Sequence, residues 1–172
     1  MKALIVALLL LIGGEAHGQL AAWVPHLNQP FVTDTLAMLV GRSLMFKKGP
    51  SAGAVAEYVA PNIVLLGVVP DSVSPDYVLA HEIGHMWADA NRTDTAIVNI
   101  LSLHDAQQRI GGYAARRSGE HAAEAFAYAV LILRLPVQEH APMLESVERR
   151  VLGTTLMYER LKAALAPRVV VR

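Results

Sequence analysis

Two histidines and a glutamate in the segment HEIGHMWAD (residues 81–89) have the types and spacing of a metal-dependent hydrolytic site. Residues four apart on a helix lie on one face, so His81 and His85 can converge on one metal ion. Glu82 is rotated from them by about 100°, toward the open side of such an ion. A zinc ion lowers the pKa of a bound water, and a neighbouring carboxylate can accept its proton. The spacing therefore predicts two zinc ligands and a general base, the alternative being two surface histidines on one helix face.

A hydrolytic zinc site takes three protein ligands and keeps one position for water, so a further ligand must come from elsewhere in the chain. The chain has no cysteine, which excludes thiolate ligands and disulfides. Metzincins place Gly and His seven and ten residues after the first histidine. Ala88 and Asn91 occupy those positions here, which excludes that class.

The remaining candidate ligands lie in the segment SGEHAAEAFAYA (residues 118–129). Glu120 and Glu124 are again four residues apart, and they share one face of an otherwise small and apolar helix. The alanines between and beside them would let this helix approach the HEIGH helix closely. Two acids on an apolar helix suggest that a cation meets them, although acids are also favoured at a helix start because they complement its dipole.

The pattern HEIGH followed by EHAAEAFA resembles the gluzincin metallopeptidases, and most closely the catalytic domain of the anthrax lethal factor group. The resemblance covers roughly residues 54–130 and is specific only at the two motifs. It implies that Glu120 is the third zinc ligand, and that Glu124 orients a zinc-bound histidine from behind. The two glutamates could also have exchanged roles.

Tyr113 lies seven residues before Glu120, and the lethal factor group has a tyrosine at the same offset from its glutamate ligand. The resemblance therefore implies that Tyr113 donates a hydrogen bond to the oxyanion of the tetrahedral intermediate, the alternative being simple packing. His104 is a second candidate for this donor. His121 should point away from the metal because adjacent helix residues diverge. Three other polar residues near the motifs are expected to face solvent: Asp89, Arg116 and Arg117.

These motifs require helices and strands that bring them together. Ser74 is a good N-cap and Pro75 suits a first helical position, which predicts a helix from about Pro75 to Ala90. Further helices are expected over residues 31–42, 95–110, 118–135 and about 143–165, the last one weakly interrupted at Gly153. Strands are expected at 43–48 and, as a pair joined at Pro61-Asn62, within 54–70.

In zincin-like folds, the strand that borders the active site binds an extended peptide by backbone pairing. The apolar segment NIVLLG (residues 62–67) precedes the HEIGH helix and is expected to have this role. Its continuous apolar character also fits a buried central strand.

Length, composition and the first residues suggest one exported domain. The chain has 172 residues, 53% of them hydrophobic and 17% charged, with a formal net charge of zero, so neither disorder nor a nucleic-acid interface is indicated. A lysine, ten apolar residues and then small residues are typical of a signal peptide over residues 1–18, followed by a single domain over 19–172. An uncleaved anchor or a buried first helix is the alternative, but the apolar run is too short to span a bilayer.

Together the motifs and the resemblance imply an α+β fold of the zincin-like metallopeptidase type, with a small antiparallel or mixed sheet packed on the active-site helix. The expected protein is a secreted or periplasmic zinc metalloendopeptidase that binds one Zn²⁺ per chain and cleaves a peptide or protein substrate. One alternative is an exported zinc-binding recognition module without catalysis, although Glu82 would then have no role. Another is a helical interaction module without metal.

Overall fold

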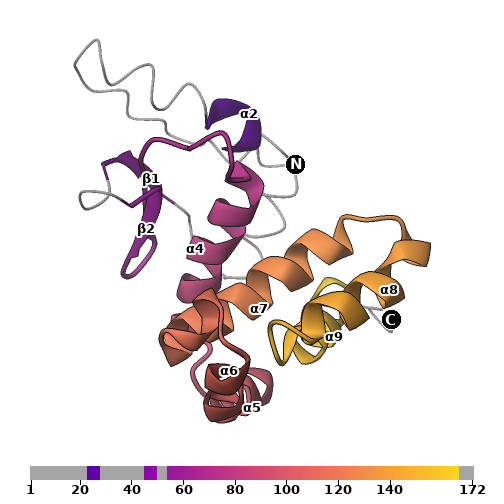
Figure 1. Cartoon of the computed structure of the whole chain (residues 1–172). Helices are drawn as coiled ribbons and strands as arrows, with labels where there is room; N and C mark the ends of the chain where they lie inside the picture. The colour runs from indigo at the N-terminus through magenta and orange to yellow at the C-terminus, as the bar shows by residue number, and fades with distance from the viewer. Residues whose placement is uncertain (1–22, 28–44, 50–53, 167–172) are drawn as a thin grey trace, which may run out of the picture.

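The protein has an α+β architecture in which a small mixed sheet lies beside a group of helices (Figure 1). A computed structural model describes residues 23–27, 45–49 and 54–166. The strands are β1 (Met45–Lys48), β2 (Ala56–Val59) and β3 (Ile63–Leu66). The helices are α2 (Val24–Leu27), α4 (Pro75–Ala90), α5 (Thr95–Ser102), α6 (His104–Ile110), the short 3₁₀ helix η2 (Tyr113–Ala115), α7 (Ser118–Leu133), α8 (Val137–Glu148) and α9 (Thr154–Leu165). The expected leader (1–18) and the expected helix over 31–42 lie outside the described residues.

The sheet has the strand order β1-β3-β2 among the described residues. β1 runs parallel to β3 and β2 runs antiparallel to it, with Tyr58 opposite Val64. The predicted strand pair around Pro61-Asn62 is therefore confirmed, and the sheet is mixed. The prediction that residues 62–67 border the active site is wrong, because β3 has a strand on each side. Its continuous apolar character reflects this central position, and among the described residues β1 and β2 are the outer strands.

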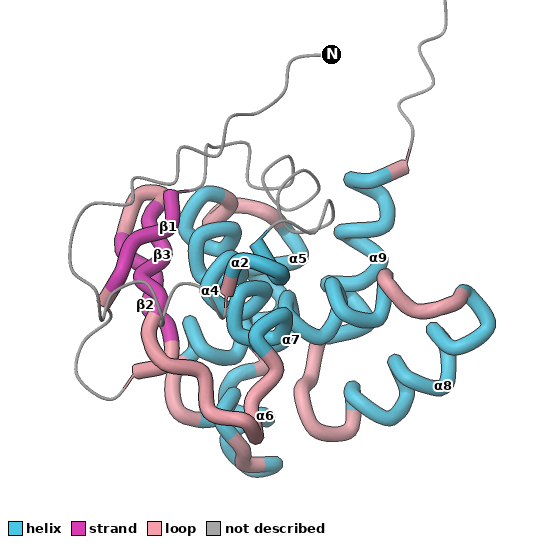
Figure 2. The backbone as a smooth tube through the Cα atoms, turned by 90° about the horizontal axis from the view of Figure 1, so that it is seen from above, coloured by secondary structure: helices cyan, strands magenta, loops and turns pink. Residues whose placement is uncertain are grey.

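α4 has the predicted bounds, Pro75 to Ala90. The Ser74 hydroxyl caps it by accepting a hydrogen bond from the backbone N–H of Tyr77 at 3.4 Å, and Pro75 occupies the first turn, where its missing N–H costs nothing. Figure 1 and Figure 2 show the sheet on one side of α4 and helices α7, α8 and α9 on the other. The HEIGH motif thus lies on a helix that is covered on two sides, which fixes the direction of its side chains.

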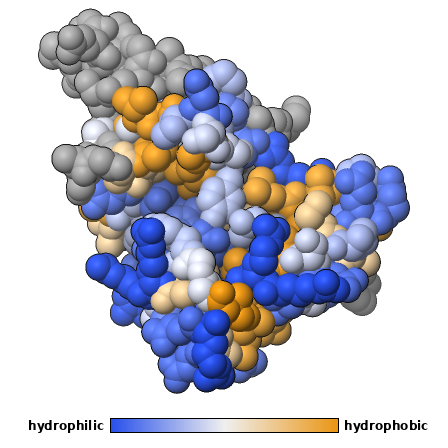
Figure 3. Space-filling model, viewed as in Figure 1, coloured by the Kyte–Doolittle hydropathy of each residue, from blue (hydrophilic) through white to orange (hydrophobic). Residues whose placement is uncertain are grey.

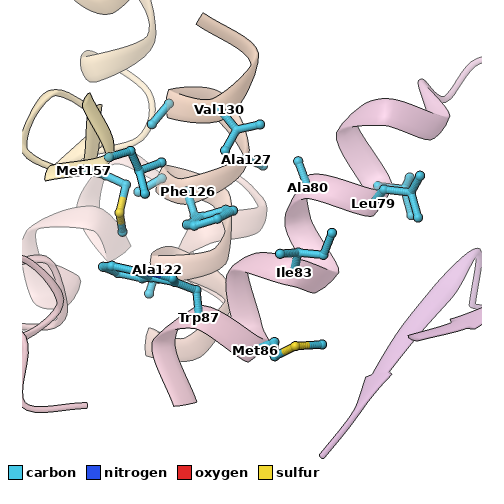
Figure 4. Close-up of a cluster of buried hydrophobic side chains, with 14 of the residues drawn as sticks. Leu79, Ala80, Ile83, Met86, Trp87, Ala122, Phe126, Ala127, Val130 and Met157 are labelled. Atoms are coloured by element: carbon cyan, nitrogen blue, oxygen red, sulfur yellow. The ribbon is translucent and has the colours of Figure 1, made fainter. Parts of the chain in front are cut away.

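The core is centred on the contact between α4 and α7 (Figure 4). Apolar residues of α4 meet Phe126 and small residues of α7, and the rings of Trp87 and Phe126 lie 5.7 Å apart, with Met157 of α9 behind them. The expected close approach of the two helices is present at Gly84. A Cβ atom added there would lie 3.0 Å from both the Cα and the carbonyl oxygen of Ala123. The close approach brings the polar side chains on the facing sides of α4 and α7 within contact distance of each other.

Gly84→Val is expected to lower the free energy of unfolding by about 1–3 kcal/mol, because the added methyl groups would force the backbones of α4 and α7 apart. Gly119→Val is a matched control, since a Cβ at that position meets nothing within 4 Å. Urea denaturation of both variants measures the difference. Equal stability of the two variants would contradict the close packing at Gly84.

The segment 95–110, which was predicted as a single helix, is divided into α5 and α6 at Leu103. The buried Gln107 side chain of α6 donates to the carbonyl oxygens of Gly111 and Arg150. The predicted interruption of the last helical segment is confirmed. The segment 143–165 is interrupted at Gly153, whose φ of 83° is left-handed and ends any continuous helix. α8 also begins earlier than predicted, at Val137.

The N-terminal described segment is tied to the domain. Trp23 is fully buried, and its indole N–H donates to the carbonyl oxygen of Gly67 at 2.8 Å. Within the described residues, none of the helices combines the length and apolar character needed to cross a bilayer. Figure 3 shows that hydrophobic residues on one face gather in separate patches divided by hydrophilic side chains.

Candidate metal centre

Three side chains from two helices converge where α4 and α7 pack together. The Glu120 Oε2 atom lies 3.0 Å from His81 Nε2 and 3.4 Å from His85 Nε2. One candidate ligand atom from each of these residues lies within 4.8 Å of the others, close enough to hold one metal ion. The four-residue spacing on α4 accounts for the shared face of His81 and His85, and the resemblance implied that Glu120 would join them.

The electrostatics of this group favour an anionic glutamate between the two histidines. Hydrogen bonds from His81 and His85 hold the pKa of the Glu120 carboxyl well below its usual range, against the opposing effect of burial. Burial alone would lower the pKa of His85, but the hydrogen bond to Glu120 and its charge raise it above the ordinary value. A divalent cation bound by these residues would displace the protons that the imidazoles donate to Glu120.

Glu82 lies beside this group and faces the edge strand of the sheet. It is 9% exposed, and burial raises the pKa of its carboxyl, against the lowering effect of His81 and His85. Its Oε2 atom accepts a hydrogen bond from the backbone N–H of Tyr58 at 2.7 Å. Tyr58 can donate in this way because it occupies a position in β2 whose N–H points away from β3. The raised pKa and the fixed orientation suit a carboxylate that accepts a proton.

Glu124 lies behind His81, on the side opposite Glu120. Its Oε1 atom is 3.7 Å from His81 Nδ1, and it accepts a hydrogen bond from the Tyr77 hydroxyl. His81 Nδ1 is buried and has no hydrogen-bond partner. The resemblance implied that Glu124 would lie on the far side of a ligand histidine, and the structure places it there.

Tyr113 lies at the same site, in η2. Its ring is 5.6 Å from that of His81, edge to face, and the Arg116 guanidinium stacks over it at 4.6 Å. Burial and the negative charges of Glu120 and Glu82 raise the pKa of the Tyr113 hydroxyl, so it remains a proton donor at neutral pH. Arg116 is exposed, as expected, but it also packs against Tyr113.

The other candidate residues have structural contacts. His121 is fully buried and turned away from the metal ligands, with Nε2 at 2.7 Å from the carbonyl oxygen of Leu152. His104, the second candidate for the oxyanion donor, places its ring 5.8 Å from that of His121. Asp89 pairs with Arg92 at 2.7 Å and also accepts a hydrogen bond from the Tyr58 hydroxyl at 3.1 Å, so it joins α4 to β2 instead of facing only solvent.

Three residues at the site were not predicted from the sequence: Tyr58, Tyr77 and Gly84. The four-residue spacing from Tyr77 to His81 was visible, and it could have indicated that Tyr77 shares the face of the ligands. The spacing from His81 to Gly84 likewise places Gly84 on the face that meets α7. The contact of Tyr58 depends on strand register, which no local pattern reveals.

The donor set fits a borderline divalent cation such as zinc. Two imidazole nitrogens and one carboxylate oxygen form a common zinc ligand set, and three protein ligands leave a position for water. The buried, unpartnered Nδ1 of His81 supports this assignment. If Nε2 binds a metal, Nδ1 must carry the ring proton, and the Glu124 carboxylate is the acceptor on that side.

Comparison of the chain with protein-family models, with curated proteins and with solved structures finds no match.

Proposed function

We propose that this protein is an exported zinc-dependent endopeptidase with a zincin-like fold of the gluzincin type. The observation that carries the proposal is the convergence of His81, His85 and Glu120 within 4.8 Å, with Glu82 beside them. A metal site with a purely structural role needs no further carboxylate beside its ligands. The burial of Glu82 and its bond to the edge strand therefore favour hydrolysis over a recognition module.

The proposed ligands are His81, His85 and Glu120, and a zinc ion bound to them would acidify a water and polarise the scissile carbonyl. Glu82 accepts a proton from the attacking water and passes it to the leaving amine. The raised pKa of its carboxyl favours acceptance of the proton, the first of these two steps. Tyr113 donates its hydroxyl proton as a hydrogen bond to the developing oxyanion.

The proposed substrate is a peptide or protein, as the resemblance implies. β2 packs against α4, and the bond from Tyr58 to Glu82 ties that strand to the proposed general base. The strand thus helps to fix the position of Glu82 beside the proposed ligands.

A peptidase assay before and after removal of metal tests the proposal. The purified protein is expected to cleave an unstructured protein such as casein, to lose this activity on dialysis against a chelator, and to recover it with one equivalent of zinc. Cleavage that survives complete removal of metal would contradict the proposal. Stoichiometric zinc binding without cleavage of any peptide would favour the recognition module.

A further inference from the structure

A row of polar side chains runs along the contact between α4 and α7, and it continues beyond the proposed metal ligands. Residues on α4 recur every four positions, and so do residues on α7: Tyr77, His81 and His85 on the first helix, and Glu120, Glu124 and Tyr128 on the second. Residues later in α7 contact residues earlier in α4. Glu120 lies between His81 and His85, and Glu124 lies between Tyr77 and His81.

Glu124 is the buried link in this row. Only 6% of the residue is exposed, and a buried carboxylate is costly unless hydrogen bonds compensate for lost water. The hydrogen bond that the structure gives it comes from the Tyr77 hydroxyl, which donates to Oε1. The same oxygen lies 3.7 Å from His81 Nδ1. Tyr77 thus holds the oxygen atom that faces the proposed ligand.

Tyr77 is itself fixed in place. Its ring packs 5.4 Å from that of Tyr128 and 6.2 Å from that of His81. Burial and the negative charge of Glu124 raise the pKa of the Tyr77 hydroxyl far above its ordinary value, so the hydroxyl keeps its proton and can donate a hydrogen bond. A hydrogen bond to a carboxylate is stronger than one between neutral groups.

We propose that Tyr77 is a positioning residue for the metal site, because its hydroxyl holds the Glu124 carboxylate against His81 Nδ1 and so presents His81 Nε2 to the metal. This inference depends on the proposed metal site. If Tyr77 were absent, the Glu124 carboxylate would lose the contact that fixes Oε1, and the ring of His81 would lose an oriented acceptor for its Nδ1 proton. The basicity of Nε2 and the orientation of the ring would both fall, and zinc affinity with them.

The test compares Tyr77→Phe with Tyr158→Phe, which removes the same hydroxyl from a buried tyrosine of α9 that bonds to His140, outside this row. Zinc affinity is measured by competition with a chromophoric chelator, after circular dichroism has shown that each variant is folded. Tyr77→Phe is expected to weaken zinc binding about 10- to 100-fold, as is typical for loss of an outer hydrogen-bond partner. Tyr158→Phe should bind zinc as the wild-type protein does. Equal affinities of Tyr77→Phe and wild type would overturn the proposal.

A double-mutant cycle separates positioning from a general structural effect. In the Glu124→Gln background, Tyr77→Phe should cause little further loss of zinc affinity, because the hydroxyl acts through the Glu124 carboxylate. A second readout is the Nδ1 proton of His81 in nitrogen-correlated spectra of the zinc-bound protein. This signal should persist in Tyr158→Phe and weaken in Tyr77→Phe. An equal loss of affinity in both backgrounds would overturn the proposal.

Failure of the proposed metal site would give a different result. In that case the wild-type protein would bind no zinc, and the inference about Tyr77 would fall with the site. If wild type binds zinc through His81 and only the Tyr77 comparison fails, the proposed function stands and the positioning role does not.

Discussion

The His81→Ala protein is expected to lose stoichiometric zinc binding. The substitution removes one of three ligands and leaves His85 and Glu120, two donors that cannot form the three-ligand site that hydrolytic zinc requires. It also leaves the Glu124 carboxylate without the imidazole that it faces. We expect a loss larger than the roughly 10- to 100-fold that follows removal of an outer partner.

Zinc content after gel filtration measures this effect, with His104→Ala as the control. His104 is also a partly buried histidine, but its ring lies against His121 and takes no part in the proposed site. It should therefore keep one zinc ion per chain. Full zinc retention by His81→Ala would show that the metal binds elsewhere.

The two glutamates of α7 extend the same prediction. Glu120→Ala should lose zinc nearly as completely as His81→Ala, since Glu120 Oε2 lies within 3.4 Å of both histidine nitrogens. Glu124→Ala should weaken binding about 10- to 100-fold and leave a detectable site. If Glu124→Ala lost zinc and Glu120→Ala only weakened its binding, the roles of the two residues would be exchanged. The proposed role of Tyr113, which was placed by its offset from Glu120, would then lose its support.

Glu82→Gln is expected to keep zinc and lose peptidase activity. The amide has the shape of the carboxylate, and its oxygen can still accept the hydrogen bond from the N–H of Tyr58, so the local structure should be retained. It cannot accept the proton of the attacking water. Loss of general acid–base catalysis typically lowers the rate by about 10²- to 10⁴-fold.

Steady-state kinetics on a quenched fluorescent peptide measures this loss, and Asp89→Asn is the matched control. Asp89 is a second carboxylate of α4 that bonds to Tyr58, and the same exchange of carboxylate for amide should leave kcat near the wild-type value. Wild-type activity in Glu82→Gln would exclude Glu82 as the base.

Tyr113→Phe should lower kcat with little change in KM, because its hydroxyl acts mainly in the transition state.

The sequence predicted best what depends on helix periodicity and capping. Ser74 and Pro75 fixed the start of α4, and its regular spacing placed His81 and His85 on one face. The convergence of Glu120 with them could be expected only through the resemblance, because the distance between two helices is not encoded in the spacing along either one. The contact of Gly84 with Ala123 supplies that distance.

Strand order and short breaks in helices could not be read from local patterns. An apolar strand such as residues 63–66 is compatible with a central or a bordering position, and only its pairing with both β1 and β2 decides between them. The break at Leu103 likewise follows no local helix-stop signal, and the buried Gln107 beyond it bonds to the carbonyl oxygen of Arg150, which is distant in the sequence. Such features depend on tertiary contacts that override local propensity.

We propose that two helices of this chain form an open three-ligand zinc site. Native mass spectrometry of the purified chain with one equivalent of zinc tests this proposal most directly, with the His81→Ala protein measured alongside. We expect one zinc ion on each wild-type chain and none on the variant. A wild-type spectrum that shows only the metal-free mass, or equal zinc occupancy on the two proteins, would contradict it.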